Sequence, residues 1–468
     1  MSKYFGTDGF RGEANVDLTA EHAFRIGLFL GWYYGRNPRF KHPLDYKAKI
    51  VIGKDTRRSS YMFENAITAG IAAGGADAYL LHVTTTPSVA YVARTEGFDC
   101  GVMISASHNP FGDNGIKLIN GNGEKMEDEV IDDVEAYLDG LFVPEGETSD
   151  GPWQVPLATG ADIGCVIDHS AGRNRYVGYL ISLATTSYKG MRVGLDCSNG
   201  STWQIAKSVF DALGAKTYVI NNQPDGVNVN KNCGSTHIEG LQQLVKDELL
   251  DVGFAFDGDA DRCLAVDENG KVVNGDEIMY VCAKYMQKKG TLGDTKVVTT
   301  IMSNFGLYKA LDELGIGYEK TAVGDKYVYE NMAANDHLIG GEQSGHIIFR
   351  KLATTGDGLI TAIKVMQCIL EQKTSLAKLT EGIIMYPQVL KNVVVTDKDA
   401  TMNDAAVLKA RDEAAGKLGD TGRVLLRKSG TEPVLRVMAE AFDPRDAEAA
   451  VDHMIDAMKQ QGLFVRFK

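Results

Sequence analysis

Three aspartates at alternate positions, Asp257, Asp259 and Asp261, follow an apolar stretch in the segment FAFDGDADRCLAVD. Alternate residues of an extended segment project to one side, so the three carboxylates can converge on one divalent cation. Three such ligands suit Mg²⁺, which keeps places for water and a phosphate oxygen. A helix-flanked calcium loop is disfavoured, because its sixth position is Arg262 instead of glycine and its flanks resemble strands. A solvated acidic turn is the alternative without a metal.

A second polar cluster ends the apolar run of GVMISASHNPFGDNGIKL, residues 101–118. Residues 102–104 read as a buried strand, which places Ser107 and His108 on an exposed loop rich in Gly, Pro, Asn and Asp. A serine beside a base can be a nucleophile. Neighbours on a loop usually point apart, however, so this stretch alone favours an ordinary polar turn. Lys117 follows where the strand pattern resumes, and by period it could simply face solvent.

Two later loops combine polar groups with glycine. In GGEQSGH, Glu342 and Ser344 alternate, so on an extended segment both could face the vicinal hydroxyls of a sugar, although a turn built on the three glycines fits the spacing equally well. In RKSGTEP, hydroxyls, backbone N–H groups and a guanidinium could form an anion cradle, with an ordinary turn as the alternative. The GxxxxGK[ST] pattern of a nucleotide-binding loop does not occur in the sequence.

The elements predicted around these loops alternate between strand and helix, which indicates largely parallel sheets covered by helices. Such sheets place their sites beyond the carboxyl ends of strands, where Ser107 lies. In three successive units the predicted strands are 49–52 and 78–81, then 192–196 and 217–220, then 296–300. The predicted helices are 61–73 and one after Pro87, then 203–213, then 276–287.

A Gly-, Pro- and acid-rich stretch at residues 143–151 is predicted to be the first linker. From residue 374 onward the pattern changes to predicted strands at 389–395, 423–426 and 434–440 and predicted helices at 403–418 and 444–460. We therefore predict an α/β protein in which three α/β domains with mixed or parallel sheets precede a smaller α+β domain. The predicted domains are residues 1–150, 151–248, 249–373 and 374–468.

Length and composition agree with a soluble globular protein of several domains. A chain of 468 residues is too long for one hydrophobic core. Its net charge of -13 argues against nucleic acid as a partner, because a nucleic-acid binder needs a basic face. The N-terminus has no apolar signal core, and no run approaches the roughly 20 apolar residues that cross a membrane, so a cytoplasmic protein is expected. Seven scattered cysteines show no metal spacing and are expected to be reduced thiols.

The motifs SASHNP with DNGIK, FDGDADR, GGEQSGH and RKSGTEP occur in this order, and together they resemble those of the alpha-D-phosphohexomutase family. The resemblance spans the chain from FGTDGFRG at residues 5–12 to the last motif. Within the family, NNQPDGVNVNKNCGSTH at residues 221–237 is similar to the phosphoglucosamine mutase branch, as is the glutamine of GGEQSGH. The resemblance implies four domains around a central cleft, the last of them TATA-binding-protein-like.

This resemblance implies an isomerase that interconverts glucosamine 6-phosphate and glucosamine 1-phosphate for UDP-N-acetylglucosamine synthesis. The reaction would pass through a phosphoserine at Ser107 and a bisphosphate that turns over without leaving. Mg²⁺ would be the metal, hexosamine 1,6-bisphosphate the activator, and a hexosamine phosphate the substrate of a monomer or homodimer. A mobile fourth domain would open for rotation of the bisphosphate and close for transfer.

The resemblance also assigns roles to residues of this chain. The catalytic residues would be Ser107, Lys117, Arg11 and His108; the substrate-binding residues Glu342, Ser344, His346 and Arg262; the phosphate-binding residues Arg427, Ser429, Gly430, Thr431 and Arg436; and the metal ligands Ser107, Asp257, Asp259 and Asp261. Without the family, Arg11 would be read as a surface arginine. For Lys117, desolvation beside other cations is expected to lower the pKa towards an acid–base role.

Two rival functions stay open from the sequence. A phosphomannomutase or phosphoglucomutase would share this machinery and differ in the sugar that it reads. A noncatalytic sugar phosphate sensor would carry no phosphoserine. The chain departs from the family pattern at Ala260, where a glycine is usual, and in extra residues around 37–46.

Overall fold

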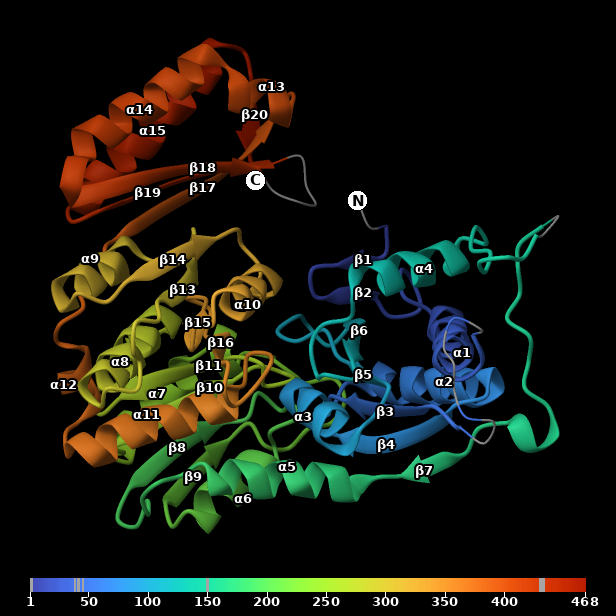
Figure 1. Ribbon diagram of the computed structural model, residues 1–468. Helices are drawn as coiled ribbons and strands as arrows, with labels where there is room; N and C mark the ends of the chain where they lie inside the picture. Colours follow the sequence, from blue (N-terminus) through green and yellow to red (C-terminus); the bar gives the residue numbers. More distant parts are fainter. Residues whose placement is uncertain (1–2, 38, 40–42, 44–45, 149–150, 429–433) are drawn as a thin grey trace. The chain divides into compact units, whose positions relative to one another are not determined.

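The structure is a computed structural model that describes residues 3–37, 39, 43, 46–148, 151–428 and 434–468. The chain divides into two compact units (Figure 1). The N-terminal unit comprises residues 1–302 and 316–381, and the C-terminal unit comprises residues 303–315 and 382–468.

The first sheet has the strand order β1-β2-β6-β5-β3-β4-β7. Its strands are β1 (Phe5–Gly6), β2 (Gly9–Glu13), β3 (Lys49–Lys54), β4 (Asp77–Val83), β5 (Cys100–Ile104), β6 (Asp113–Asn120) and β7 (Val166–Asp168), and the helices of this part are α1 (Ala20–Arg36), α2 (Arg58–Gly74), α3 (Thr86–Glu96) and α4 (Asp128–Leu138). Strands β5, β3, β4 and β7 are parallel, whereas β6 and β2 run antiparallel to their neighbours. Helices α1 and α2 pack side by side (Figure 1). The predicted α/β alternation is therefore correct, but α1 and β7 lie outside the predicted elements.

The second sheet has the order β12-β11-β10-β8-β9. Its strands are β8 (Arg192–Asp196), β9 (Lys216–Ile220), β10 (Val252–Phe256), β11 (Cys263–Asp267) and β12 (Val272–Val273), with α5 (Ser170–Ser182), α6 (Ile205–Ala212), α7 (Glu239–Asp247) and the 3₁₀ turns η1 (Gly160–Asp162) and η2 (Gly234–Thr236). Strands β10 and β11 form an antiparallel hairpin whose turn carries the three aspartates. The flanks of that turn are strands, as the apolar residues predicted.

The third sheet has the order β14-β13-β15-β16. Its strands are β13 (Val297–Thr300), β14 (Tyr318–Thr321), β15 (Ile339–Gly341) and β16 (Ile347–Phe349), and its helices are α8 (Gly275–Lys288), α10 (Asp325–Ala334), α11 (Gly358–Gln372) and α12 (Leu376–Thr380). The turn of the β15–β16 hairpin is the GGEQSGH segment. Helix α11 begins where Gly358 N donates to Ala260 O, so it braces the aspartate turn.

The C-terminal unit contains an antiparallel sheet of order β18-β19-β17-β20. Its strands are β17 (Gln388–Val395), β18 (Gly422–Lys428), β19 (Val434–Ala441) and β20 (Phe464–Phe467), and its helices are α9 (Phe305–Leu314), α13 (Lys398–Asn403), α14 (Ala405–Leu418) and α15 (Pro444–Gln460), with the 3₁₀ turn η3 (Gly419–Thr421). The apolar stripe of α15, which includes Val451, Met454 and Ile455, packs on this sheet. The predicted fold class, three α/β domains followed by a smaller domain of α+β type, is confirmed.

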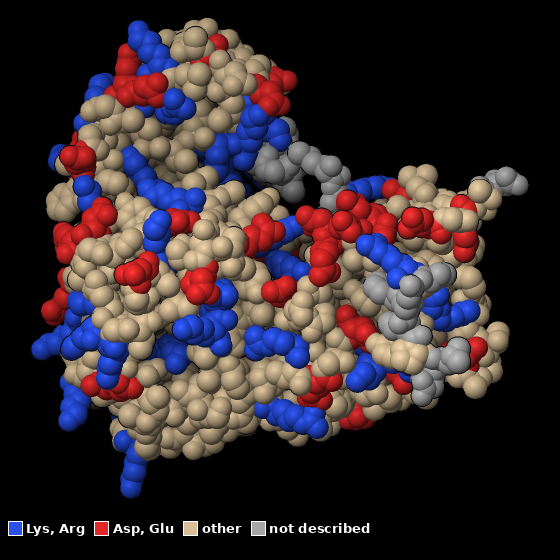
Figure 2. All heavy atoms as spheres, viewed as in Figure 1, with Lys and Arg blue, Asp and Glu red and all other residues tan. Residues whose placement is uncertain are grey.

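The molecular surface carries both signs of charge. On the face drawn in Figure 2, lysines and arginines are interspersed with acidic side chains, and acidic residues gather over α4, whose sequence is DEVIDDVEAYL. No helix among the described residues has both the length and the apolar character needed to span a membrane. Positive charge for binding a phosphate is therefore to be sought in local clusters, because this face offers no broad basic surface.

Candidate active site

Ser107 lies three residues beyond the carboxyl end of β5, in the loop that leads to β6. The loop is exposed only from Pro110 to Gly112, whereas Ser107 is fully buried, so the prediction of an exposed serine is wrong. Its φ of 52° is in the left-handed region, which few residues other than glycine adopt without support from their surroundings. The loop thus turns Ser107 inward, towards the second sheet.

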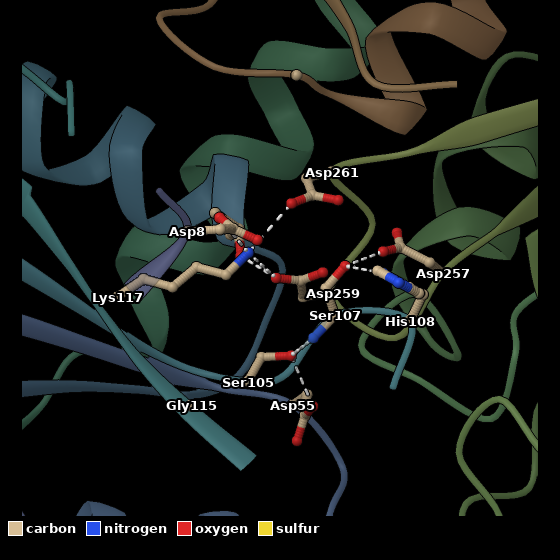
Figure 3. Close-up of polar contacts among 12 residues, drawn as sticks. Asp8, Asp55, Ser105, Ser107, His108, Gly115, Lys117, Asp257, Asp259 and Asp261 are labelled. Atoms are coloured by element: carbon tan, nitrogen blue, oxygen red, sulfur yellow. Dashed lines mark hydrogen bonds and ion pairs between the residues drawn. The ribbon is translucent and has the colours of Figure 1, made fainter. Parts of the chain in front are cut away.

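The aspartate turn meets this serine across 150 residues of sequence (Figure 3). Ser107 Oγ donates a hydrogen bond of 2.5 Å to Asp257 Oδ2. His108 Nδ1 lies 3.5 Å from the same hydroxyl, so the imidazole and the carboxylate both face Ser107. The spatial convergence of these two loops, on which the sequence interpretation depends, is present in the structure.

The three aspartates form the arrangement expected of a cation site. Each offers one carboxylate oxygen, and these oxygens lie within 4.8 Å of one another, all on buried residues. Burial and repulsion from the neighbouring carboxylates raise the pKa of Asp257 and of Asp259. The buried atoms Asp259 Oδ1 and Asp261 Oδ1 have no hydrogen-bond partner among the described residues. Crowded, incompletely paired carboxylates of this kind fit a hard divalent cation.

Lys117 on β6 is 6% exposed, so it does not face solvent. Its Nζ donates to Asp259 Oδ2 at 2.9 Å and to Asp261 Oδ2 at 3.1 Å. Burial alone would lower the pKa of Lys117, but the carboxylates of Asp259, Asp261 and Asp8 outweigh burial and hold that pKa well above its usual value. The expected lowering of the pKa is therefore wrong for this constellation, because the nearest charges are anionic.

The other two residues with predicted catalytic roles, His108 and Arg11, lie near the charged groups of this cluster. Burial, followed by the charges of Arg262 and Arg11, lowers the pKa of His108 to about 4, so its imidazole is neutral at pH 7. Arg11 lies on β2 opposite Gly115 of β6 and forms an ion pair with Asp8. The buried Arg11 Nε has no hydrogen-bond partner within the described part of the chain. A guanidinium with an unpartnered N–H, close enough to His108 and Lys117 for its charge to act on both, is suited to bind a phosphate oxygen.

The GGEQSGH segment is a tight turn and not the extended segment on which Glu342 and Ser344 would share one face. Glu342 N donates to His346 O, and Gly345 N donates back to Glu342 O. Gly345 has a φ of 92°, and a Cβ there would lie 2.4 Å from Cys263 O, so glycine is required where the turn contacts β11. Ser344 is exposed at the turn.

Three residues with predicted substrate-binding roles are brought together by this turn. His346 pairs with Arg262 in an isolated β-bridge, which docks the turn on the aspartate loop. Burial raises the pKa of Glu342, and the charges of His346 and Arg262 oppose that rise. The atoms Arg262 Nε and His346 Nδ1 are buried without a hydrogen-bond partner among the described residues. These donors and the Glu342 carboxylate could therefore serve sugar hydroxyls.

A cavity of about 320 Å³ opens beside Lys117 and Asp261. Its wall includes Asp8, Lys125 and Asp325. Lys125 Nζ lies 2.7 Å from Asp325 Oδ1, and the other carboxylate oxygen of Asp325 lies 3.4 Å from His346 Nε2. Sequence patterns do not single out Lys125 or Asp325, whereas Asp8 was available as the central acid of FGTDGFRG.

In the C-terminal unit, Arg427 on β18 lies directly opposite Arg436 on β19. Directly opposed residues of antiparallel strands project from the same face, so the two guanidinium groups are neighbours. Burial and the charge of Arg436 lower the pKa of Arg427, and the buried Arg427 Nε has no hydrogen-bond partner among the described residues. The remaining predicted members of this cradle, Ser429, Gly430 and Thr431, lie outside the described residues.

Comparison with protein families gives a match to four consecutive domains. They are phosphoglucomutase/phosphomannomutase alpha/beta/alpha domain I at residues 2–141, domain II at 174–270, domain III at 274–386 and the C-terminal domain at 390–458. Together these matches extend over both units of the chain.

Two bacterial proteins are similar over almost the whole chain. The phosphoglucosamine mutase of Lachnospira eligens is 64% identical over 465 residues, which is 99% of this chain and 100% of the relative. The phosphoglucosamine mutase of Lachnoclostridium phytofermentans is 58% identical over 462 residues and 99% of each chain.

Solved structures with this fold share less sequence. A phosphoglucomutase/phosphomannomutase family protein of Burkholderia thailandensis has a TM-score of 0.80 at 21% identity, with 100% of both chains covered. The Aspergillus fumigatus N-acetylphosphoglucosamine mutase, crystallised with GlcNAc-6P and magnesium, has a TM-score of 0.67 at 18% identity over 99% of this chain and 96% of that one. At these identities the likeness concerns the fold.

Proposed function

We propose, because this chain belongs to the phosphoglucomutase/phosphomannomutase family, that it interconverts glucosamine 6-phosphate and glucosamine 1-phosphate. The sugar is proposed from the relatives at 64% and 58% identity, which are phosphoglucosamine mutases. The observation that carries the chemistry is the hydrogen bond from Ser107 Oγ to Asp257 within a buried carboxylate cluster. A hydroxyl placed there can carry a phosphoryl group next to a cation site.

The proposed reaction begins with a phosphoryl group on Ser107. The C1 hydroxyl oxygen of glucosamine 6-phosphate attacks the phosphorus and loses its proton, while the bond from phosphorus to Ser107 Oγ breaks and that oxygen gains a proton. The resulting 1,6-bisphosphate turns over within the protein. Ser107 Oγ then gives up its proton and takes the phosphoryl group from C6, whose oxygen gains a proton, and glucosamine 1-phosphate leaves. The same bisphosphate, supplied from solution, would restore the phosphoserine whenever it is lost, which makes it the proposed activator.

Asp257, Asp259 and Asp261 would hold Mg²⁺ together with the phosphate of Ser107. The ion would neutralise negative charge on the transferring phosphoryl group. The unpaired oxygens Asp259 Oδ1 and Asp261 Oδ1 support this assignment, since they are buried acceptors that no described protein group satisfies.

Proton transfer is proposed for Lys117 and His108. Neutral His108 can accept a proton 3.5 Å from Ser107 Oγ, and protonated Lys117 can donate one. Because Lys117 owes its high pKa to Asp259, Asp261 and Asp8, it loses part of that stabilisation when the first two carboxylates bind a cation. This loss would bring its pKa closer to the range of a general acid.

The two ends of the substrate would use different parts of the chain. We assign the sugar ring to Glu342, His346 and Arg262, with Ser344 at the rim of the turn. The nonreacting phosphate is assigned to Arg427 and Arg436 with Ser429, Gly430 and Thr431, and the reacting phosphate also to Arg11. The pair of adjacent guanidinium groups on β18 and β19 supports the site for the nonreacting phosphate.

The covalent step is tested by the intact mass of freshly purified protein. We expect an added mass of roughly 80 Da that maps to the peptide containing Ser107. Incubation with glucosamine 6-phosphate in excess should discharge the group and yield the bisphosphate. A protein that never carries phosphate at Ser107, even after incubation with a hexose 1,6-bisphosphate, would favour a noncatalytic sugar phosphate sensor.

The sugar is tested by rates with the 6-phosphates of glucosamine, glucose and mannose under identical conditions. We expect the largest kcat/KM for glucosamine 6-phosphate. A larger value for glucose or mannose 6-phosphate would replace the proposal by phosphoglucomutase or phosphomannomutase activity, while the phosphoserine chemistry would stand.

A further inference from the structure

The asparagine-rich loop at residues 221–237 has no role in the chemistry described so far, yet it reaches Ser107 directly. Asn230 Nδ2 donates to Ser107 O at 2.8 Å and to Asn109 O at 3.1 Å. Asn230 is only 7% exposed. The two carbonyl groups belong to the catalytic loop of the first sheet, whereas Asn230 comes from the loop that follows β9 of the second sheet. This amide therefore links two domains at the reacting serine.

The same two carbonyl groups accept hydrogen bonds from a second buried side chain. Arg57 Nη2 donates to Ser107 O at 2.9 Å and to Asn109 O at 2.9 Å, and Arg57 Nη1 donates to Asp113 O at 3.1 Å. Arg57 is fully buried and pairs with Asp55, whose carboxylate also accepts from Ser105 Oγ. Four hydrogen bonds, made by two side-chain nitrogens from two domains, are thus directed at one pair of loop carbonyls.

Asn230 is held by the same framework that carries the aspartates. Its backbone N donates to Ser198 O at 2.9 Å, in the loop after β8, and Ser201 N of that loop donates to Gly258 O at 2.8 Å. A Cβ at Gly258 would lie 2.6 Å from Ser107 O, so the aspartate turn packs directly on the carbonyl that Asn230 binds. The backbone and the hydroxyl of Ser107 are consequently both fixed to the second sheet.

From this geometry we infer that Asn230 is a positioning residue for phosphoryl transfer: its amide holds the left-handed backbone of Ser107 in register with the aspartate turn. The expected effect on kcat rests on the proposed function, whereas the restraint on the Ser107 loop does not. Asn230 reaches Ser107 only through the backbone, so it takes no part in bond making. A shift of about 1 Å at a reacting group costs about a hundredfold in rate, which makes such a restraint important.

The test compares Asn230→Ala and Asn230→Asp with Asn228→Ala. Asn228 lies in the same loop, and among the described residues its side chain bonds within that loop, donating to Gln223 O and accepting from Asp225 N. We expect both Asn230 variants to lose about 10- to 100-fold in kcat with less than about threefold change in KM. Asn230→Asp should be the slower one, because its carboxylate fills the same space but faces two carbonyl oxygens without a donor.

Hydrogen exchange of the full-length variants supplies a readout that needs no turnover. Peptides covering residues 104–113 should exchange faster in both Asn230 variants than in wild type, and Asn228→Ala should match wild type there. If Asn230→Asp kept the kcat of wild type, the amide would only fill space and the inference would be overturned. If no protein had mutase activity but exchange still rose, the proposed function would fail and the positioning of the Ser107 loop would stand.

Discussion

The Ser107 loop and the Arg427–Arg436 pair are both proposed to handle phosphate, but they are built in opposite ways. Around Ser107, carbonyl groups of the loop are bonded by Arg57 and Asn230, and the hydroxyl donates to Asp257. At Arg427, by contrast, a buried Nε has no described hydrogen-bond partner, and the directly opposed residue has the same charge. The carbonyl groups of the Ser107 loop are held by internal hydrogen bonds, whereas at Arg427 a buried guanidinium N–H has no partner among the described residues.

This difference teaches which demand each region meets. A group that makes and breaks bonds must keep its atoms in place, which favours a loop with more restraints than its stability alone requires. A site for a phosphate that arrives at either end of the substrate must gain its bonds from the ligand, which favours donors without partners in the free protein. Changes at the first region should therefore act on the chemical step, and changes at the second on binding.

The largest effect is expected from Ser107→Ala. Loss of the phosphoryl carrier should reduce kcat by at least about a thousandfold and leave binding of glucosamine 6-phosphate within about threefold of wild type. Steady-state rates and isothermal titration calorimetry measure the two quantities, with Ser182→Ala, an exposed serine of α5, as control. A variant that turned over at the normal rate would exclude the covalent route and remove the basis of the comparison.

Removal of divalent cations should have the next largest effect. Chelation is expected to lower kcat by about 10²- to 10³-fold, because several kcal/mol of charge stabilisation are lost from the transferring phosphoryl group. Returning Mg²⁺ should restore the rate and raise the Tm of the protein, since the ion binds the folded aspartate cluster only. Asp259→Asn should lose both responses. A Tm that is insensitive to Mg²⁺ in wild type would contradict a cation site at these carboxylates.

Binding is the quantity that Arg427→Ala should change. Loss of a charge-assisted donor is expected to raise KM for the sugar phosphate by about 10- to 100-fold, with kcat within about threefold of wild type. Arg436→Ala should behave alike, and Arg466→Ala on the exposed strand β20 provides the control. If kcat fell instead while KM stayed constant, Arg427 would act on the chemical step, and the division of labour between the two regions would be wrong.

Local sequence patterns predicted those helices and strands well that carry a clear start signal or a clear apolar period. The Asp443–Pro444 start and apolar stripe of α15 gave its bounds, and alternation of strand and helix indicated the parallel part of the first sheet. The short edge strand β7 was missed, because three largely exposed residues carry little pattern. Helix α1 begins at a reciprocal cap in which Thr19 Oγ1 accepts from His22 N and His22 Nδ1 accepts from Thr19 N. Because this residue is histidine, the Glu or Gln that marks a capping box in a sequence is absent.

The site shows where sequence patterns stop being sufficient. The three aspartates were recognisable because their spacing is itself the signal. The raised pKa of Lys117 depends on Asp259 and Asp261, more than 140 residues away in sequence, so no local pattern could predict its direction. The same holds for Asn230, whose role appears only when the loops of two sheets meet. Electrostatic and positioning roles thus require the tertiary arrangement.

The smallest predicted effect concerns stability and separates the two regions in the absence of substrate. Because Arg427 is partly buried next to Arg436, replacing its charge while keeping an apolar stem, as in Arg427→Met, should stabilise the free protein by about 1 kcal/mol or less after screening by solvent. Urea unfolding of the full-length protein in a buffer without phosphate or sulfate measures this difference, with Arg466→Met as control.

Inorganic phosphate should reverse the order of stability of wild type and Arg427→Met. It is expected to raise the urea midpoint of wild type by binding the guanidinium groups of Arg427 and Arg436, and to leave the midpoint of Arg427→Met nearly unchanged. At the Ser107 loop we expect the opposite change in stability. Asn230→Ala removes a donor there, which leaves buried carbonyl groups with fewer partners and destabilises the free protein. A destabilised Arg427→Met would show that the charge of Arg427 is already compensated within the folded chain, and the contrast between the two phosphate regions would not hold.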